Sequence, residues 1–388
     1  MKIFYTLIII VFLSFTTLNA QWDTCSNGLT NLNVTSLAVS GNNLFAGTSG
    51  DGIFLSTDDG NTWSAINSGL TNLNITTIAT MDTNIFCGTM GGGIFLSTDN
   101  SNSWTPKDSG LINMLITTLA ANDSSIYAVI FKNGIVSLDS GSFWIAKDSG
   151  LTDLHVLSLL IKDTILFAGT NGSGIFLSID SGKSWKQQNS GLTNMEVMTF
   201  DTIGTNLLAG TYGGGIFLSS DNGNSWNVKD TGLTNLYITS IKTNGNYIFA
   251  GTWGGGIYLS SDNGNTWVVK NLGLTNLFIT SFIINGNYIY AGTNGGIFKA
   301  KLSDFVPVNV SENNKKINYL IYPNPAGNFL IVHNDNMYEK EISIYDMLGN
   351  KLLSVRAESS ETRLDIESLS TGVYIIRIGE QTKIFVKE

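Results

Sequence analysis

The sequence predicts an all-β protein, in which a seven-bladed β-propeller closed by an N-terminal strand precedes a small C-terminal β-sandwich. Each 40- or 41-residue interval between recurring Trp residues holds four short apolar runs separated by Gly, Asn, Asp or Ser. Four strands in about 41 residues are typical of a propeller blade. The 13% charged content excludes a coiled coil, and the 11% aromatic content excludes a disordered chain. The recurring residues are Trp22, Trp63, Trp104, Trp144, Trp185, Trp226 and Trp267.

Residues 1–20 have the features of a secretory signal peptide. One Lys precedes an apolar run from Ile3 to Leu13, and a short polar stretch ends on the small residue Ala20. This run is too short to span a bilayer, and small residues before a cleavage site are typical of exported proteins. We therefore expect the mature chain to begin at Gln21 and to contain no membrane span.

The two ends of the repeat region complement each other. The first repeat predicts three strands within residues 34–56 and a fourth that opens at Trp63. The seventh unit, residues 277–300, has three strands and no Trp-bearing fourth, whereas the mature chain begins with a single strand that carries Trp22. We therefore expect this strand to complete the last blade and to close the ring over residues 21–302, which removes exposed sheet edges.

A second motif, S-x-D-x-G-x-[ST]-W or a near copy, lies between the third and fourth strands of six units. It resembles the Asp-box (BNR) repeat of the propellers found in sialidases, sortilin-type receptors, xyloglucanases and photosystem assembly factors. The resemblance implies the fold and leaves the activity open. Six copies around a ring cannot form one active site, so we expect each carboxylate to accept hydrogen bonds within its own turn and to bind no metal. The carboxylates are those of Asp58, Asp99, Asp139, Asp180, Asp221 and Asp262.

The composition changes after Leu302. Three of the four Pro and all three Arg follow it, and residues 303–317 predict an exposed linker. Residues 318–388 contain strand-like runs between turns, which predict a small antiparallel sandwich. The predicted strands are residues 329–332, 342–345, 351–355, 373–378 and 383–386. The chain is therefore expected to hold two domains joined by a linker.

Four motifs in residues 318–388 carry a second resemblance. They read Y-P-N-P at 322–325, I-S-I-Y-D-M-L-G-N at 342–350, S-T-G-V-Y-I-I-R at 370–377 and K-I-F-V-K at 383–387. In this order they are similar to the type A C-terminal sorting domain of type IX secretion substrates. The resemblance implies that this segment engages the type IX secretion machinery and that the protein is secreted or displayed on the surface of a Gram-negative cell. An ordinary accessory β-sandwich is the alternative. The motif residues are Pro323, Asn324, Pro325, Gly349, Gly372, Tyr374, Lys383 and Lys387.

Charge and cysteine content exclude other classes of protein. The net charge is −9, and residues 21–302 contain 11 Lys, 17 Asp, one Glu and no Arg. Nucleic acids are held by clustered Lys and Arg, so we expect no nucleic-acid partner. Cys25 and Cys87 are too few for a disulfide framework, and Cys87 stands where other repeats have Ala, which predicts a small buried side chain.

Two positions of the repeat vary while their neighbours do not. One precedes the innermost strand and the other follows the Ala-Gly-Thr motif, so both lie at the end of the ring opposite the Asp-box turns. Trp253, at one of them, stands outside the periodic Trp series, so packing of the repeat does not require it. We expect the cluster on three consecutive blades to bind an extracellular glycan or protein without a cofactor, with repeat drift on a tolerant loop as the alternative. The cluster comprises Glu196, Tyr212, Tyr237, Trp253 and Phe278.

A polysaccharide-degrading enzyme is the alternative function. Glycoside hydrolysis needs two carboxylates that face one another within about 10 Å. Asp153 and Glu196, on adjacent blades with His155 nearby, are the pair that the propeller loops offer. A sialidase mechanism would need clustered arginines, which the predicted propeller lacks. We favour a binding protein and assign no catalytic residue.

Overall fold

The computed structural model describes residues 21–99, 102–122, 124–139, 142–305, 319–333, 341–346, 349–378 and 381–388. The chain divides into two compact units, residues 1–306 and 307–388, and each is described by itself. The predicted signal peptide and residues 306–317 of the predicted linker lie outside the described residues. In the part of the chain that the structure describes, no helix has the length and apolar character needed to cross a membrane.

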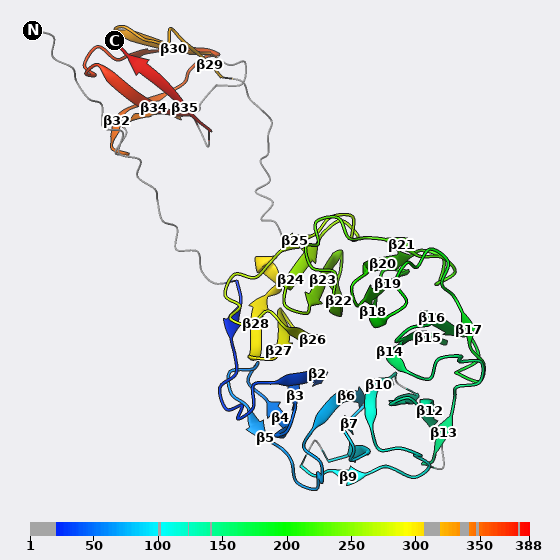
Figure 1. The fold of residues 1–388 in the computed structure, drawn as a ribbon. Helices are drawn as coiled ribbons and strands as arrows, with labels where there is room; N and C mark the ends of the chain where they lie inside the picture. Colours follow the sequence, from blue (N-terminus) through cyan, green and yellow to red (C-terminus); the bar gives the residue numbers. More distant parts are fainter. Residues whose placement is uncertain are drawn as a thin grey trace, which may run out of the picture. The chain divides into compact units, whose positions relative to one another are not determined.

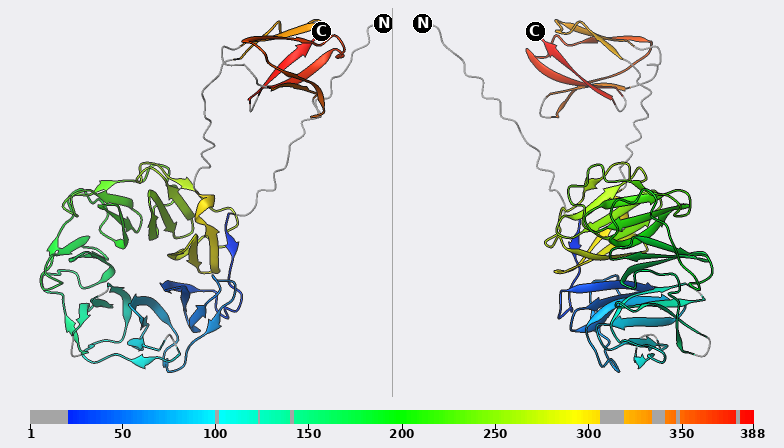
Figure 2. Two further views of the ribbon diagram at one scale, coloured as in Figure 1. Left: turned by 180° about the vertical axis from the view of Figure 1, so that it is seen from behind. Right: turned by 45° about the vertical axis from the view of Figure 1, so that its right-hand side comes forward.

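The first unit is a ring of seven four-stranded antiparallel sheets, the blades of a β-propeller (Figure 1). In six blades the order of the strands from the innermost to the outermost is their order in the chain. The left view of Figure 2 shows the ring from behind. The second strand of a blade is buried almost throughout because neighbouring blades cover both of its faces, which explains continuous apolar runs such as L-F-A-G-T. The fourth strand is short and exposed.

Blades one to three have twelve strands. They are β2 (Val34–Ser40), β3 (Asn43–Thr48), β4 (Gly52–Ser56), β5 (Ser64–Ala65), β6 (Ile75–Met81), β7 (Asn84–Thr89), β8 (Ile94–Ser97), β9 (Thr105–Pro106), β10 (Ile116–Ala121), β11 (Ile126–Ile130), β12 (Gly134–Leu138) and β13 (Trp144–Ala146).

Blades four to six repeat the pattern. Their strands are β14 (Val156–Lys162), β15 (Ile165–Thr170), β16 (Ile175–Ser178), β17 (Lys186–Gln187), β18 (Val197–Ile203), β19 (Asn206–Thr211), β20 (Gly215–Ser219), β21 (Asn227–Val228), β22 (Ile238–Asn244), β23 (Tyr247–Thr252), β24 (Gly256–Ser260) and β25 (Val268–Val269).

The seventh blade joins the two ends of the repeat region. It consists of β26 (Ile279–Asn285), β27 (Tyr288–Thr293), β28 (Gly296–Lys301) and the N-terminal strand β1 (Asp23–Thr24). Strand β1 lies antiparallel to β28, with Asp23 opposite Lys299. This confirms the predicted seven-bladed ring closed by an N-terminal strand.

The periodic Trp side chains join each blade to the one before it. All seven are between 1% and 6% exposed. The Trp63 indole N–H donates to the carbonyl oxygen of Cys25 at 2.7 Å, and Trp226 donates in the same way to Gln188 at 3.1 Å. A buried indole needs such a partner, so the Trp both fills the core and pairs its own N–H.

The chain leaves the ring through a short 3-10 helix, η1 (Leu302–Asp304). The next residue, Phe305, is buried, and its ring lies 5.6 Å from that of Trp22 and 4.9 Å from that of Phe249. Phe305, which the sequence placed in the linker, therefore packs on the propeller. The run S-D-F-V-P-V at 303–308 lies outside the repeat, so the repeat pattern could not predict this packing.

The two cysteines are free and buried. Burial raises the pKa of the Cys25 thiol to about 12 and also raises that of Cys87. Both thiols therefore act as small apolar side chains, as the sequence predicted for Cys87.

The second unit is a small β-sandwich with one shared core. One sheet has the order β29 (Leu320–Tyr322), β30 (Phe329–His333), β33 (Glu361–Asp365), and the other has the order β32 (Lys351–Arg356), β31 (Glu341–Tyr345), β34 (Gly372–Ile378), β35 (Gln381–Lys387). Leu330 and Val332 from the first sheet pack with Ile344, Ile376 and Phe385 from the second. The sandwich is confirmed, although the sequence missed β29 and β33, which are short and mostly exposed.

The Y-P-N-P motif docks on the last strand. The Val386 N–H donates to Asn324 Oδ1 at 2.9 Å, and the Ala326 N–H donates to the Val386 carbonyl at 2.7 Å. Pro323 and Pro325 flank this contact on the segment between β29 and β30. The first and last motifs of the domain, Y-P-N-P and K-I-F-V-K, therefore meet along the edge of β35.

The other motif residues serve the sandwich itself. Gly349 has φ +86° in a turn that Asp346 caps, and Gly372 opens β34 opposite Lys387. Tyr374 stacks on Phe385 and donates to the Ser370 carbonyl, while Lys383 donates to the Tyr319 carbonyl. The Lys387 side chain is buried and its ammonium donates to the Glu388 carbonyl.

Candidate functional site

The five predicted binding residues form one continuous row across blades five to seven. The Tyr212 N–H donates to the Glu196 carbonyl at 2.9 Å, and the Trp253 N–H donates to the Tyr237 carbonyl at 2.9 Å. Between blades, β-bridges pair Tyr212 with Tyr237 and Trp253 with Phe278. Side chains at directly opposite positions share one face. We call Glu196, Tyr212, Tyr237, Trp253 and Phe278 the aromatic row.

The rings of the aromatic row pack in two edge-to-face pairs. The centroids of Tyr212 and Tyr237 are 4.8 Å apart at an angle of 65°, and those of Trp253 and Phe278 are 5.2 Å apart at 79°. Trp253 and Tyr237 are each 46% exposed, and Phe278 is 38% exposed. The row therefore presents aromatic surface while its members fix one another.

Glycine beside each pair leaves room for a ring. A Cβ on Gly213 would lie 3.3 Å from Tyr237 Cε1, and one on Gly254 would lie 3.4 Å from Phe278 Cε1. Both glycines have positive φ, near +95° and +88°. The Tyr237 and Phe278 rings therefore cover glycine backbone in the turns that follow Tyr212 and Trp253.

An Asn two residues before each innermost-strand position holds the backbone of the row. Asn235 Oδ1 accepts the Tyr237 N–H at 2.9 Å, and its Nδ2 donates to the Trp253 carbonyl at 3.0 Å. Asn194 makes the same pair of bonds to Glu196 and Tyr212. Sequence reasoning missed these residues, although the repeated T-N dipeptide was the available signal.

One member of the alternative catalytic pair, Asp153, belongs to the same clamp in its own blade. Asp153 occupies the clamp position of its blade, and its Oδ1 accepts the His155 N–H at 2.9 Å. A carboxylate cannot donate the second bond that Asn gives. The structure therefore places Asp153 in the turn of the repeat, and the His155 ring packs edge-to-face on Phe131 at 5.0 Å.

The Asp-box carboxylates are occupied by their own turns. Asp180 Oδ1 accepts the Ser184 N–H at 2.9 Å and the Ser178 hydroxyl at 2.8 Å, while Oδ2 accepts the Ser184 hydroxyl at 2.6 Å. These hydrogen bonds lower the pKa of Asp180 to about 2. Asp58, Asp99, Asp221 and Asp262 are bound alike.

Asp139 belongs to a degraded copy of the box. Its Oδ1 accepts the Phe143 N–H at 2.7 Å, and Phe143 has no hydroxyl to donate to the second oxygen. Among the described residues, no group of three or more His, Cys, Asp or Glu is arranged to hold a metal ion. The expectation that the protein uses no cofactor stays a prediction.

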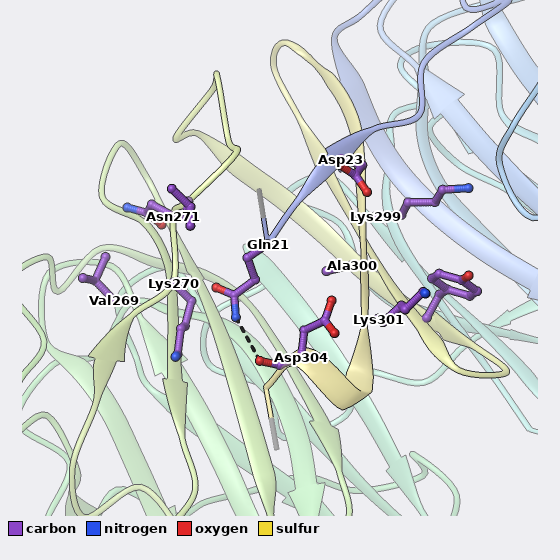
Figure 3. Close-up of a pocket in the computed structure, with 11 residues that line it drawn as sticks. Gln21, Asp23, Val269, Lys270, Asn271, Lys299, Ala300, Lys301 and Asp304 are labelled. Carbon is purple, nitrogen blue, oxygen red and sulfur yellow. Dashed lines mark hydrogen bonds between the residues drawn. The ribbon is translucent and has the colours of Figure 1, made fainter. Parts of the chain in front are cut away.

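A pocket of about 880 Å³ lies away from the aromatic row, where β1 meets β28 (Figure 3). Its lining includes Gln21, Lys299 and Asp304. Lys299 donates to Asn61 Oδ1 at 2.7 Å, and Gln21 donates to the Asp304 carbonyl at 3.4 Å. These groups belong to the seam that closes the ring, and none of the five residues of the aromatic row lines this pocket.

A family model matches the second unit. It covers residues 320–388 and describes a secretion system C-terminal sorting domain. Residues 320–388 are a secretion sorting domain. This sorting domain implies export of the protein to the medium or to the outer cell surface. A search by sequence among curated proteins gives no match to the chain.

Solved structures similar to the chain are β-propellers. PorZ, a surface component of the type IX secretion system of Porphyromonas gingivalis, is 16% identical with a TM-score of 0.56 over 93% of this chain and 60% of that one. The extracellular domain of a putative one component system of B. thetaiotaomicron is 16% identical with a TM-score of 0.62 over 87% of this chain and 47% of that one. YCF48 bound to D1 peptide is 16% identical with a TM-score of 0.60 over 73% of this chain and 97% of that one. The chain thus spans less than two thirds of the first two, and the likeness shows the fold alone.

Proposed function

We propose that this exported protein is a non-catalytic binding module, whose propeller holds an extracellular glycan or protein partner on the aromatic row. The type IX secretion machinery is the proposed partner of the sorting domain during export. The observation that carries the proposal is that four aromatic rings form two edge-to-face pairs on consecutive blades and that three of them, Tyr237, Trp253 and Phe278, are exposed.

The propeller does not need these aromatic side chains for its own stability. The positions equivalent to Trp253 carry Ser49, Asn171 and Asn294 in other blades, and all three are exposed. The Asn235 clamp holds the backbone whichever side chain stands there. A backbone fixed before binding lowers the entropy lost on association, which favours a binding role.

The comparison structures support a surface binding role. PorZ is described as a bacterial surface component, and YCF48 is described as bound to a peptide. A propeller of this architecture can therefore present a site for a protein segment.

The test is a glycan and peptide array probed with the purified protein and two variants. Trp253→Ala removes the most exposed large ring of the row, and Met90→Ala changes an equally placed, 62% exposed side chain on blade two. We expect a ligand whose signal falls with Trp253→Ala and persists with Met90→Ala. A ligand that binds Trp253→Ala and Met90→Ala with the same affinity as the native protein would contradict the proposed site.

Export is tested by deleting residues 306–388. A chain that ends at Phe305 retains the residue that packs on Trp22, so the propeller is expected to fold and to remain in the periplasm. Surface display of the truncated chain at the native level would contradict the role proposed for the sorting domain.

A further inference from the structure

The loops around the aromatic row carry negative charge and no positive charge. Glu196 and Asp230 are the charged residues within them, and they contain neither Lys nor Arg. Asp230 lies beside Gly215, at the end of the turn that Tyr212 begins. The loops are residues 189–196, 212–214, 230–237, 253–255, 271–278 and 294–295.

Two lysines of blades four and five extend toward the Asp-box turns. Lys229 Nζ donates to Asn265 Oδ1 at 2.5 Å, and Lys162 Nζ donates to Asn222 Oδ1 at 3.0 Å. Both acceptors lie in Asp-box turns, at the opposite end of the ring from the row. An anionic ligand would therefore find no counter-charge at the row, whereas a cation would.

Blade three shows how a cation sits at the equivalent position. There Lys132 follows Phe131, and its ammonium nitrogen lies 5.2 Å from the centroid of the Phe131 ring. In blades five and six the residue after the ring is Gly213 or Gly254, so no side chain of the chain covers the ring from that position. The row thus lacks the Lys that blade three has at this position.

The geometry of the aromatic rings also suits a cationic ligand. Rings at 65° and 79° form walls whose faces point in different directions, and aromatic faces attract ammonium and guanidinium groups.

We propose that the aromatic row binds Lys or Arg side chains of an extended peptide segment of a protein partner, with Glu196 as the counter-ion. This rests on the proposed function and narrows it to one ligand class. The row crosses three blades and is longer than one cationic side chain requires, so a peptide suits it better than a small free cation.

The test is calorimetric titration of the full-length protein with matched probes. The probes are blocked Gly-Ser peptides that carry two Lys, two Arg, two Gln or two Glu at the same positions, and a neutral cello-oligosaccharide. We expect the Lys and Arg peptides to bind at least about tenfold more tightly than the others, and added salt to weaken them.

Variants locate the binding on the row. We expect Trp253→Ala to weaken the Lys peptide by about 5- to 30-fold and Glu196→Gln by about 3- to 5-fold. Tyr237→Leu is a second ring variant in case Trp253→Ala alters folding. The controls are Met90→Ala and Asp82→Asn, an exposed carboxylate in the turn between β6 and β7, and neither is expected to change the affinity.

The outcomes separate this inference from the proposed function. If the Gln peptide or the oligosaccharide binds as tightly as the Lys peptide and depends on Trp253, the cationic ligand is wrong and the binding site stands. If no probe binds, the inference is overturned. If a probe binds and ignores Trp253, Tyr237 and Glu196, both the inference and the site are wrong.

Discussion

The indole N–H of Trp22 donates to the carbonyl oxygen of Lys270 at 2.8 Å, across 248 residues of sequence. This bond repeats, between the two ends of the ring, the contact that every other periodic Trp makes with the preceding blade. Trp22 also packs against Phe305, so the first and last described segments of the propeller meet at one side chain. Ring closure therefore depends on a residue outside the six continuous blades.

Trp22→Ala is expected to destabilise the whole ring. Loss of a fully buried indole should lower the free energy of unfolding by about 3–5 kcal/mol through the cavity that it leaves. Urea unfolding followed by circular dichroism measures this. Gln21→Ala is the control, because that side chain makes a single long hydrogen bond at the surface. Equal stability of the two variants would contradict the role of Trp22 in closure.

The Asp boxes should make stability depend on pH in the acid range. The folded pKa of Asp180 is about 2, below its ordinary value of 3.8, so its contribution to stability is present above pH 4 and is lost as the pH falls toward 2. Asp180→Asn should therefore be less stable than the native protein at pH 7, and the difference should shrink between pH 4 and pH 2.

Asp139→Asn is the matched control for this pH dependence. Asp139 accepts one backbone N–H and no hydroxyl from the residue that pairs with it, so its substitution should change the pH profile less. Urea unfolding at several pH values compares the three proteins. A gap between native protein and Asp180→Asn that is as large at pH 2 as at pH 7 would refute the charge-assisted hydrogen bonds as its cause.

Asp153→Asn should stabilise the propeller. The new amide would donate to the Asn171 carbonyl as Asn194 donates to that of Tyr212, and one added hydrogen bond contributes about 0.5–1.5 kcal/mol. Asn235→Asp is the reciprocal change and should destabilise by a similar amount. Thermal unfolding of both variants is the measurement. A destabilised Asp153→Asn would show that the carboxylate has a role outside the clamp.

Sequence predicted the fold well because the determinants of a blade are local and repeated. Every blade repeats the same turn glycines, apolar runs and Trp, and this pattern predicts a propeller. The single N-terminal strand with Trp22 predicted how the ring closes. The clamp by Asn235 was not predicted, because T-N-L also suits an ordinary turn. The aromatic row was predicted as a set, but the pairing of Tyr212 with Tyr237 depends on how adjacent blades are registered. Strands β29 and β33 were missed because mostly exposed strands give a weak apolar pattern.

The two classes of Trp should differ in their effect on stability. Trp226 is 2% exposed, so Trp226→Ala should lower the free energy of unfolding by about 3–5 kcal/mol. Trp253 is 46% exposed and pairs edge-to-face with Phe278, so Trp253→Ala should lower it by only about 0.5–1.5 kcal/mol. Chemical unfolding of both variants measures this. Unfolding of the protein by Trp253→Ala would show that the row is part of the core.

Fluorine NMR of the protein labelled with fluorotryptophan tests the binding site most directly. The chain has eight Trp, and Trp253→Phe assigns the resonance of the one in the row. On titration with the tightest-binding array ligand, we predict that the Trp253 resonance shifts to saturation while those of the seven buried Trp stay in place. A ligand that shifts Trp22 or Trp267 and leaves Trp253 unmoved would place binding elsewhere on the propeller and contradict the account.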